Sequence, residues 1–194
     1  MPSAPRLMLY RTQILDDSGV SRVLGQVDPI LVTNPLKNVN EDKGIDPEWL
    51  DEQIAESLQP ELTLSSGRTG FTFKKYTAGQ DYDWHQDEIT SIDGLRLDVS
   101  TTLFLNDPTD YEGGELELRF GDFGVSIKLP AGYAVMYPTG IIHRVKPIIS
   151  GVRKVVHWWD ESNVQNPFTR DAIVQLSKRP ERVDLHTATL ERFC

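Results

Sequence analysis

The chain has 194 residues, of which 39% are hydrophobic and 25% are charged, and its formal net charge is -9. These values are ordinary for one soluble globular domain, and no apolar stretch is long enough to span a membrane. The acidic balance argues against the electrostatic binding of phosphates on which nucleic-acid binders depend. The N-terminus lacks an apolar signal segment and Cys194 is the only cysteine, so we expect a cytoplasmic protein without internal disulfides.

The first part of the chain predicts one strand and two helices. Residues 7–15 alternate between apolar and polar types, which is typical of a strand, and residues 18–26 follow two aspartates that can cap a helix. The polar stretch 37–44 indicates a loop. Residues 46–48 (Asp-Pro-Glu) form a strong helix start, and Pro60 ends that helix. The inward stripe of this second helix is expected to contain Leu50, Ile54 and Leu58.

After Gly70 the hydrophobic pattern changes to a period of two, which indicates a run of short strands separated by Gly, Pro, Asn and Asp. Seven or eight such strands predict a sandwich or barrel. After Pro167 we expect a last helix with Ala172, Ile173 and Leu176 inward, and then a loose polar tail from Arg179. The expected strands cover residues 71–76, 95–99 continuing through 100–105, 115–120, 125–129, 133–137, 141–146 and 152–159.

His85, Asp87 and His143 are the candidate metal ligands. His85 and Asp87 are two residues apart, so on an extended segment their side chains point the same way, and His143 would come from another strand. Two imidazoles and one carboxylate form the facial triad that holds Fe(II) and leaves other positions open. Zinc accepts the same ligands, although no HExxH helix supplies a protease base. The alternative without a metal is that both histidines are ordinary half-buried residues.

Arg153 is the candidate co-substrate residue. Arg153, Val155, His157 and Trp159 occur at steps of two, so on one strand they share a face. If that face is inward, a buried guanidinium requires a partner, and a bidentate carboxylate is its best match. The alternative is an outward Arg153 paired with a surface acid, with Lys154 inward.

Other residues near this pattern are open to more than one interpretation. His157 is either a residue that faces the metal or substrate, or a hydrogen-bonded core histidine, and Tyr82 is a further candidate of the same kind. Tyr76 either reaches the pocket with its hydroxyl or packs in the core. Trp158 and Trp159 are expected in the core with one ring near the pocket, and His186 is expected to be solvated.

Residues 76–87 resemble the Y-x-x-G-x-x-Y-x-x-H-x-D segment of the PKHD-type hydroxylases, which belong to the prolyl 4-hydroxylase-like branch of the Fe(II)/2-oxoglutarate-dependent oxygenases. The resemblance extends in order over roughly residues 71–162, and the chain before about residue 65 departs from it. The blocks that carry it are residues 97–108, 111–116, 129–132, 137–138, 143–145 and 151–153.

The resemblance implies a mainly β protein with flanking helices and a double-stranded β-helix (jelly-roll) core. It implies Fe(II) on His85, Asp87 and His143, and 2-oxoglutarate with its distal carboxylate on Arg153. Further co-substrate residues implied by it are Tyr76, Thr102 and Trp159, and ascorbate is expected as an additional cofactor. Asp87 favours hydroxylation, because halogenating relatives carry a small residue there. We therefore expect one domain over residues 1–194, with N-terminal support over 1–65, the jelly-roll core over about 66–162, and a helix and tail over 163–194.

The expected reaction is hydroxylation of a protein, peptide or amino acid by dioxygen, with a prolyl residue as the best guess and with release of succinate and CO2. No catalytic residue is expected beyond the metal and co-substrate ligands. The alternatives are oxidation or demethylation of a small metabolite, a non-catalytic jelly roll that keeps a metal site, and a zinc hydrolase. A nucleic-acid demethylase is disfavoured by the charge. Residues 37–44 and 88–94 are candidate lids, and the oligomeric state is left open.

Overall fold

The computed structural model describes residues 8–31, 47–57 and 65–177. Within these ranges the chain forms eleven strands, grouped in two sheets, and three helices. The predicted class, mainly β with flanking helices, is therefore confirmed. Among the described helices, none is long and apolar enough to cross a membrane.

The larger sheet has its strands in the spatial order β1-β9-β5-β11-β2, and β3 and β6 also pair with the long strand β11. All of these pairings are antiparallel. The strands span Tyr10–Gln13 (β1), Ser65–Arg68 (β2), Thr72–Thr77 (β3), Val99–Phe104 (β5), Tyr111–Gly113 (β6), Tyr133–Pro138 (β9) and Ile148–Ser162 (β11).

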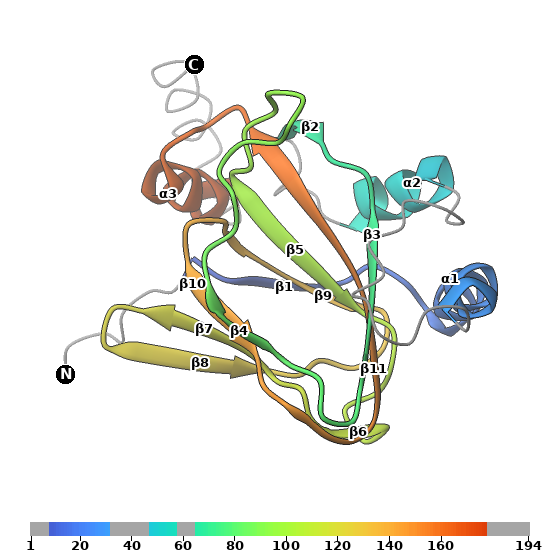
Figure 1. Ribbon diagram of the computed structural model, residues 1–194. Helices are drawn as coiled ribbons and strands as arrows, with labels where there is room; N and C mark the ends of the chain where they lie inside the picture. Colours follow the sequence, from blue (N-terminus) through green and yellow to red (C-terminus); the bar gives the residue numbers. More distant parts are fainter. Residues whose placement is uncertain (1–7, 32–46, 58–64, 178–194) are drawn as a thin grey trace.

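The smaller sheet has the antiparallel order β4-β10-β7-β8 and lies against one side of the larger sheet (Figure 1). Its strands span Tyr82–His85 (β4), Leu116–Phe120 (β7), Phe123–Ile127 (β8) and Ile142–Val145 (β10). Two facing sheets of short antiparallel strands leave an interior between them, and side chains that alternate along each strand point either into that interior or away from it.

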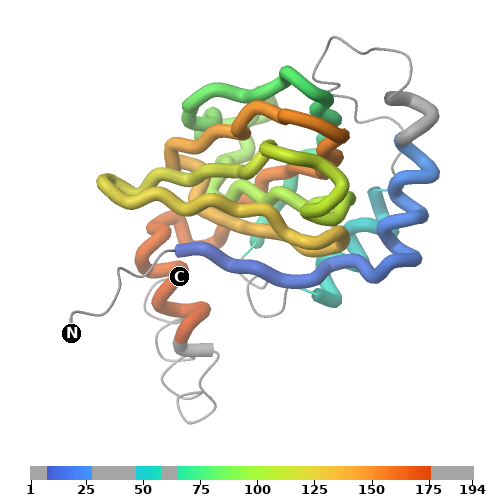
Figure 2. The backbone as a smooth tube through the Cα atoms, turned by 90° about the horizontal axis from the view of Figure 1, so that it is seen from below, coloured from blue at the N-terminus to red at the C-terminus, as the bar shows by residue number. Residues whose placement is uncertain are grey.

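Three helices lie outside the sheets: α1 (Asp17–Leu31), α2 (Pro47–Ser57) and α3 (Pro167–Ser177). Helices α1 and α2 cover the outer face of the larger sheet (Figure 1). Helix α3 lies near β1, which runs along the edge of the larger sheet beside β9 (Figure 2). The Tyr10 hydroxyl of β1 donates a 2.7 Å hydrogen bond to the Asp171 carboxylate of α3.

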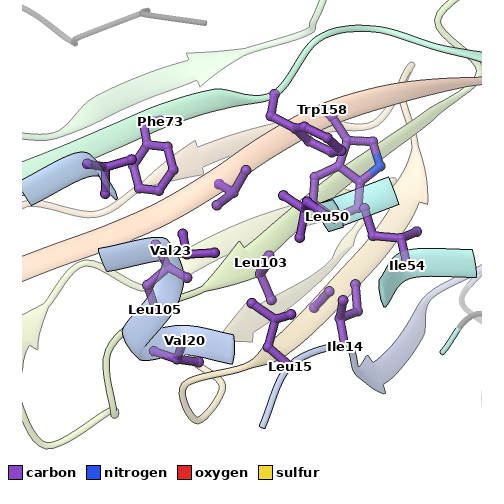
Figure 3. Packing of buried hydrophobic residues seen from close by; sticks show 14 of the residues in the cluster. Ile14, Leu15, Val20, Val23, Leu50, Ile54, Phe73, Leu103, Leu105 and Trp158 are labelled. Atoms are coloured by element: carbon purple, nitrogen blue, oxygen red, sulfur yellow. The ribbon is translucent and has the colours of Figure 1, made fainter. Parts of the chain in front are cut away.

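Period-two alternation divides the larger sheet into two faces. On β11, Val156 and Trp158 face outward into the cluster with α1 and α2, which Figure 3 shows around Trp158, Leu50 and Leu103. Val155 faces inward and packs with residues of β5, β7 and β9. The outer cluster is continuous and apolar, because α1 and α2 bury Val23, Leu50 and Ile54 there. The helices thus complete a core on one face and leave the opposite face for the interior between the sheets.

The sequence predicted most strands well but missed three. The strand predicted for 95–99 is wrong over residues 95–98, which form one isolated bridge and no strand, and β5 begins at Val99. Strands β2, β4 and β6 were not predicted, because they are short and pair without an alternating apolar pattern. The first helix extends beyond the predicted 18–26, and the first strand is shorter than 7–15.

The inward residues of the helices were predicted in part. Leu50 and Ile54 of α2 are buried, as is Ile173 of α3, whereas Ala172 is exposed and the prediction for it was wrong. Asp171 and Val174 lie on the buried side instead, since Asp171 pairs with Tyr10 of β1. The predictions for the loop 37–44, Leu58, the side chain of Leu176 and the tail from Arg179 lie outside the described residues.

Gly132 links the segment that follows β1 to the larger sheet, and substitution of this glycine tests that contact. Its N–H donates to the Phe104 carbonyl at 2.8 Å, and its carbonyl accepts the Ile14 and Leu15 N–H groups at 2.8 and 3.1 Å. Its φ is +81°, and an added Cβ would collide with the Leu15 carbonyl. We expect Gly132→Ala to lower the free energy of unfolding by about 3 kcal/mol or more, because a steric clash adds to the strain of positive φ.

Gly121→Ala is the matched control, since Gly121 also has a positive φ of 61° but has nothing within 4 Å of an added Cβ. It should cost only the backbone strain, about 1 kcal/mol. Urea denaturation of both variants measures the difference. Equal losses of unfolding free energy in the two variants would show that Leu15, which follows β1, does not approach Gly132 as closely as described.

Candidate active site

The two sheets bring His85, Asp87 and His143 together. His85 ends β4, Asp87 follows two residues later, and His143 of β10 is the register partner of His85 across the β4–β10 pair. One possible ligand atom from each of the three residues lies within 4.8 Å of the others. The Nε2 atoms of His85 and His143 are 3.6 and 3.7 Å from the same Asp87 oxygen, Oδ1. Strand pairing therefore converts residues 58 positions apart in the sequence into neighbours.

Backbone carbonyls set the orientation of both imidazoles. His85 Nδ1 lies 2.7 Å from the Asp83 carbonyl, and His143 Nδ1 lies 2.9 Å from the Ile141 carbonyl. A carbonyl only accepts, so each ring donates through Nδ1–H and its Nε2 carries the free lone pair. This is the tautomer that a metal ligand requires, and such an outer hydrogen bond fixes ligating histidines in metal sites.

The Asp87 carboxylate is held at its other oxygen. The Ser100 hydroxyl and the Trp159 indole N–H each donate to Oδ2 at 3.0 Å. Oδ1 is thereby left to face the two Nε2 atoms. Three ligand atoms with free lone pairs thus converge from fixed side chains, which fits a divalent metal ion.

The electrostatics favour the protonation states that bind metal. Burial alone would raise the pKa of Asp87, but His85, His143, His157 and the Trp159 N–H outweigh it and hold the pKa well below the usual range. Burial lowers the pKa of His143, against the opposing effect of Asp87. At neutral pH the site therefore presents one carboxylate and neutral imidazole, the forms in which these groups act as ligands.

The trio lies in an open cleft that is lined by residues of both sheets. Besides the trio, its lining includes five residues that the sequence analysis singled out and one that it did not: Tyr76, Tyr82, Thr102, Arg153 and His157, with Lys74. Trp159 contributes to the same site through Asp87, and His186 lies outside the described residues.

Arg153 lies at the base of this cleft with a side chain that is only 1% exposed. Its guanidinium carbon is 5.2 and 5.3 Å from the centroids of the Tyr76 and Phe104 rings. Within the described part of the chain, Nε is a buried donor without a hydrogen-bond partner, and no carboxylate lies within ion-pair distance. A buried, unpaired guanidinium is costly, so the geometry fits a carboxylate ligand that enters the cleft.

His157 projects from β11 of the larger sheet toward the trio. Its Nδ1 is 3.3 Å from the Thr102 hydroxyl, its Nε2 is 3.9 Å from Asp87 Oδ2, and its ring meets the Trp159 ring edge-on at 4.3 Å. Burial, with the nearby charge of Lys74, lowers the pKa of His157 to about 3. His157 is therefore a neutral side chain of the cleft wall at neutral pH.

Sequence reasoning missed Ser100 and Lys74. Each precedes a predicted pocket residue by two positions, Ser100 before Thr102 on β5 and Lys74 before Tyr76 on β3. The period of two along a strand was the signal that could have identified both, because residues i and i+2 share a face.

Comparisons with known proteins agree with this geometry. Residues 71–160 match the model of the 2OG-Fe(II) oxygenase superfamily. A PKHD-type hydroxylase from Colwellia psychrerythraea is 35% identical over 155 residues, which is 74% of this chain and 70% of that protein. The chain belongs to the PKHD-type hydroxylases of this superfamily. The name of the superfamily refers to the Fe(II) and 2-oxoglutarate that its oxygenases use.

Several of the PKHD-type relatives that the chain matches are longer, and the chain spans between about half and two thirds of their length. A PKHD-type hydroxylase from Picosynechococcus sp. is 39% identical over 132 residues, which is 66% of this chain and 60% of that protein. The prolyl hydroxylase of Trichoplax adhaerens, solved with a hypoxia-inducible-factor peptide, aligns with a TM-score of 0.56 at 18% identity, over 85% of this chain and 86% of that one. This likeness confirms the predicted double-stranded β-helix.

The donor pair on Asp87 yields a test of the metal site. We expect Trp159→Phe to weaken Co(II) binding by about tenfold, because the ring remains but the N–H that orients the carboxylate is lost. Isothermal titration of metal-free protein with Co(II), an air-stable substitute for Fe(II), measures the effect.

Trp158→Phe is the matched control. Trp158 donates its N–H to Asp160 at 3.0 Å on the outer face of the sheet, away from the trio. Its loss should lower stability without changing Co(II) affinity. If the two variants weakened Co(II) binding equally, the Trp159–Asp87 contact would have no specific role in metal binding.

Proposed function

We propose that His85, Asp87 and His143 hold Fe(II), that Arg153 binds the distal carboxylate of 2-oxoglutarate, and that the enzyme hydroxylates an amino-acid, peptide or protein substrate, with prolyl as the proposed residue. One observation carries the proposal. Three oriented ligand atoms and a buried guanidinium without a carboxylate partner share one cleft. A dicarboxylate with a 2-oxo group matches both ends of such a cleft.

Fe(II), when bound, supplies the oxidative decarboxylation of 2-oxoglutarate to succinate and CO2, in which one atom of O2 enters succinate and the other becomes the substrate hydroxyl. The residues of the chain bind and orient the reactants. Arg153 provides a planar, bidentate donor at the base of the cleft, and Tyr76 stacks against it. Thr102 lines the same wall and is in contact with His157.

Asp87 has a second role in this proposal. Its carboxylate occupies the ligand position that Ser100 and Trp159 define, so no space is left there for an exchangeable anion. This supports hydroxylation. The inward aromatic residues Tyr76, Phe104 and Tyr137 exclude water from the base of the cleft, which strengthens the pairing of Arg153 with a carboxylate.

Peptide hydroxylation is supported by the likeness in fold to a peptide-bound prolyl hydroxylase and by the open side of the cleft. Tyr82 and Trp84 of β4 are 37% and 40% exposed, and Ile89 and Ile92 in the segment 88–94 are exposed as well. Tyr82 lines the cleft, and the other three flank the metal ligands in sequence, so that together they offer apolar contact area to a substrate. We retain ascorbate as a reductant, a cytoplasmic location and a single catalytic unit over residues 1–194 as predictions.

An anaerobic titration with Fe(II) and 2-oxoglutarate tests the cofactor assignment. We expect a visible metal-to-ligand charge-transfer band in the wild type and no band in His143→Ala. Arg153→Leu should need about 10- to 100-fold more 2-oxoglutarate, because a charge-assisted pair is lost.

Lys154→Leu is the control for Arg153→Leu, since Lys154 is adjacent on β11 but does not line the cleft. It should titrate like the wild type. Absence of the band in the wild type, together with tight zinc binding, would instead identify a zinc site and contradict the proposal.

A further inference from the structure

Lys74 is a second cation in the cleft, and none of the roles above uses it. It lies on β3 two residues before Tyr76, so both side chains point to the same face, and both line the cleft with the metal trio. Its ammonium nitrogen is 5.3 Å from the centroid of the Tyr82 ring, which stands at the open side. Lys74 therefore lies nearer the mouth than Arg153, which is only 1% exposed.

Lys74 differs from several other cations of the described fold in having no carboxylate partner. Arg68, Arg96, Arg144 and Lys146 each form an ion pair with an aspartate or glutamate. Over the described ranges, Lys74 forms no ion pair or hydrogen bond, although Asp87 is close enough to act on its charge. Burial lowers the pKa of Lys74, with Asp87 opposing and Arg153 reinforcing the effect. A cation in this position is stabilised by an anionic ligand.

Counting the charges of the site with Fe(II) and 2-oxoglutarate bound leaves one positive charge without a partner. On the proposed function, on which this step rests, the two positive charges of Fe(II) and the one of Arg153 balance the charge of Asp87 and the two carboxylates of 2-oxoglutarate. Among the residues that line the cleft, Lys74 is the one other side chain with a formal charge, because the remaining ionisable residues there are histidines and tyrosines. The charge of Lys74 is then left over after the co-substrate has bound.

We propose that Lys74 binds a carboxylate of the primary substrate, so that the enzyme selects a small carboxylic acid, such as a free amino acid, whose carboxylate lies close to the carbon that is oxidised. The position of Lys74 supports binding of a substrate carboxylate. Its ammonium lies on the exposed Tyr82 side of the cleft, while Arg153 lies at the base. The alternative ligand of Lys74 is the carboxylate of 2-oxoglutarate that lies beside the metal. The experiment below distinguishes this carboxylate from that of the substrate.

The first arm measures binding of a minimal carboxylate. The protein is loaded with Mn(II) in place of Fe(II) and saturated with 2-oxoglutarate, so that the metal and Arg153 are engaged. Sodium acetate is added, and relaxation of its methyl protons by the paramagnetic metal reports binding near the site, with acetamide as the uncharged probe. We expect acetate, but not acetamide, to bind the wild type, and Lys74→Met to bind acetate about tenfold more weakly because a charge-assisted contact is lost.

Two variants complete this arm. Lys74→Arg keeps the charge and should retain acetate binding. Lys75→Met removes the adjacent lysine, which does not line the cleft, and should match the wild type. Thermal unfolding of each variant shows whether a loss reflects damage to the fold.

The second arm is the anaerobic Fe(II) charge-transfer titration with 2-oxoglutarate. The proposal predicts that Lys74→Met changes the 2-oxoglutarate affinity by no more than about twofold, a small free-energy change. A large loss of 2-oxoglutarate affinity in Lys74→Met would assign the lysine to the co-substrate and overturn the proposal. It is also overturned if acetate does not bind the wild type, or binds wild type and Lys74→Met equally. Failure of the proposed function has a different signature: the wild type itself shows no charge-transfer band.

Discussion

The antiparallel pairing of β4 with β10 is the constraint on which the site depends. It makes His85 and His143 register partners, so two imidazoles that are remote in sequence meet with their Nε2 atoms toward one carboxylate oxygen. A one-residue slip of this pairing would turn one of the two side chains to the opposite face. Because β10 also pairs with β7, which is buried against the larger sheet, the register is tied to the core rather than to the exposed strand β4.

The long strand β11 gives the site its second half. Its outward residues Val156 and Trp158 pack beneath α1 and α2, and this packing holds Arg153 and His157 on the inward face. Stability and function thus use alternate residues of the same strand. Trp159 connects the halves, because its N–H holds Asp87, which follows β4 of the other sheet. A change in the outer core would therefore be transmitted to the metal ligands through the backbone of β11.

Sequence patterns were sufficient for the features that depend on period and on residue type. The alternation after Gly70 predicted most strands of both sheets, and the spacing of Arg153, Val155 and His157 predicted a shared face. Tertiary pairing decided the features that sequence did not predict. Residues 95–98 alternate but form only one isolated bridge, whereas Tyr82–His85 of β4 pairs as a strand with little apolar patterning. Ala172 is exposed because Asp171 turns inward to reach Tyr10, a contact that helical spacing does not encode.

Each end of the cleft has one positively charged residue. We assign Arg153 at the base to the co-substrate and Lys74 toward the mouth to the substrate, with the metal ligands between these two residues. The decisive measurement is a crystal structure grown without oxygen, with Fe(II) and 2-oxoglutarate bound. We expect iron bound by His85 Nε2, Asp87 Oδ1 and His143 Nε2, with the distal carboxylate of 2-oxoglutarate on Arg153. Iron bound by other residues, or a 2-oxoglutarate carboxylate turned away from Arg153, would contradict this expectation.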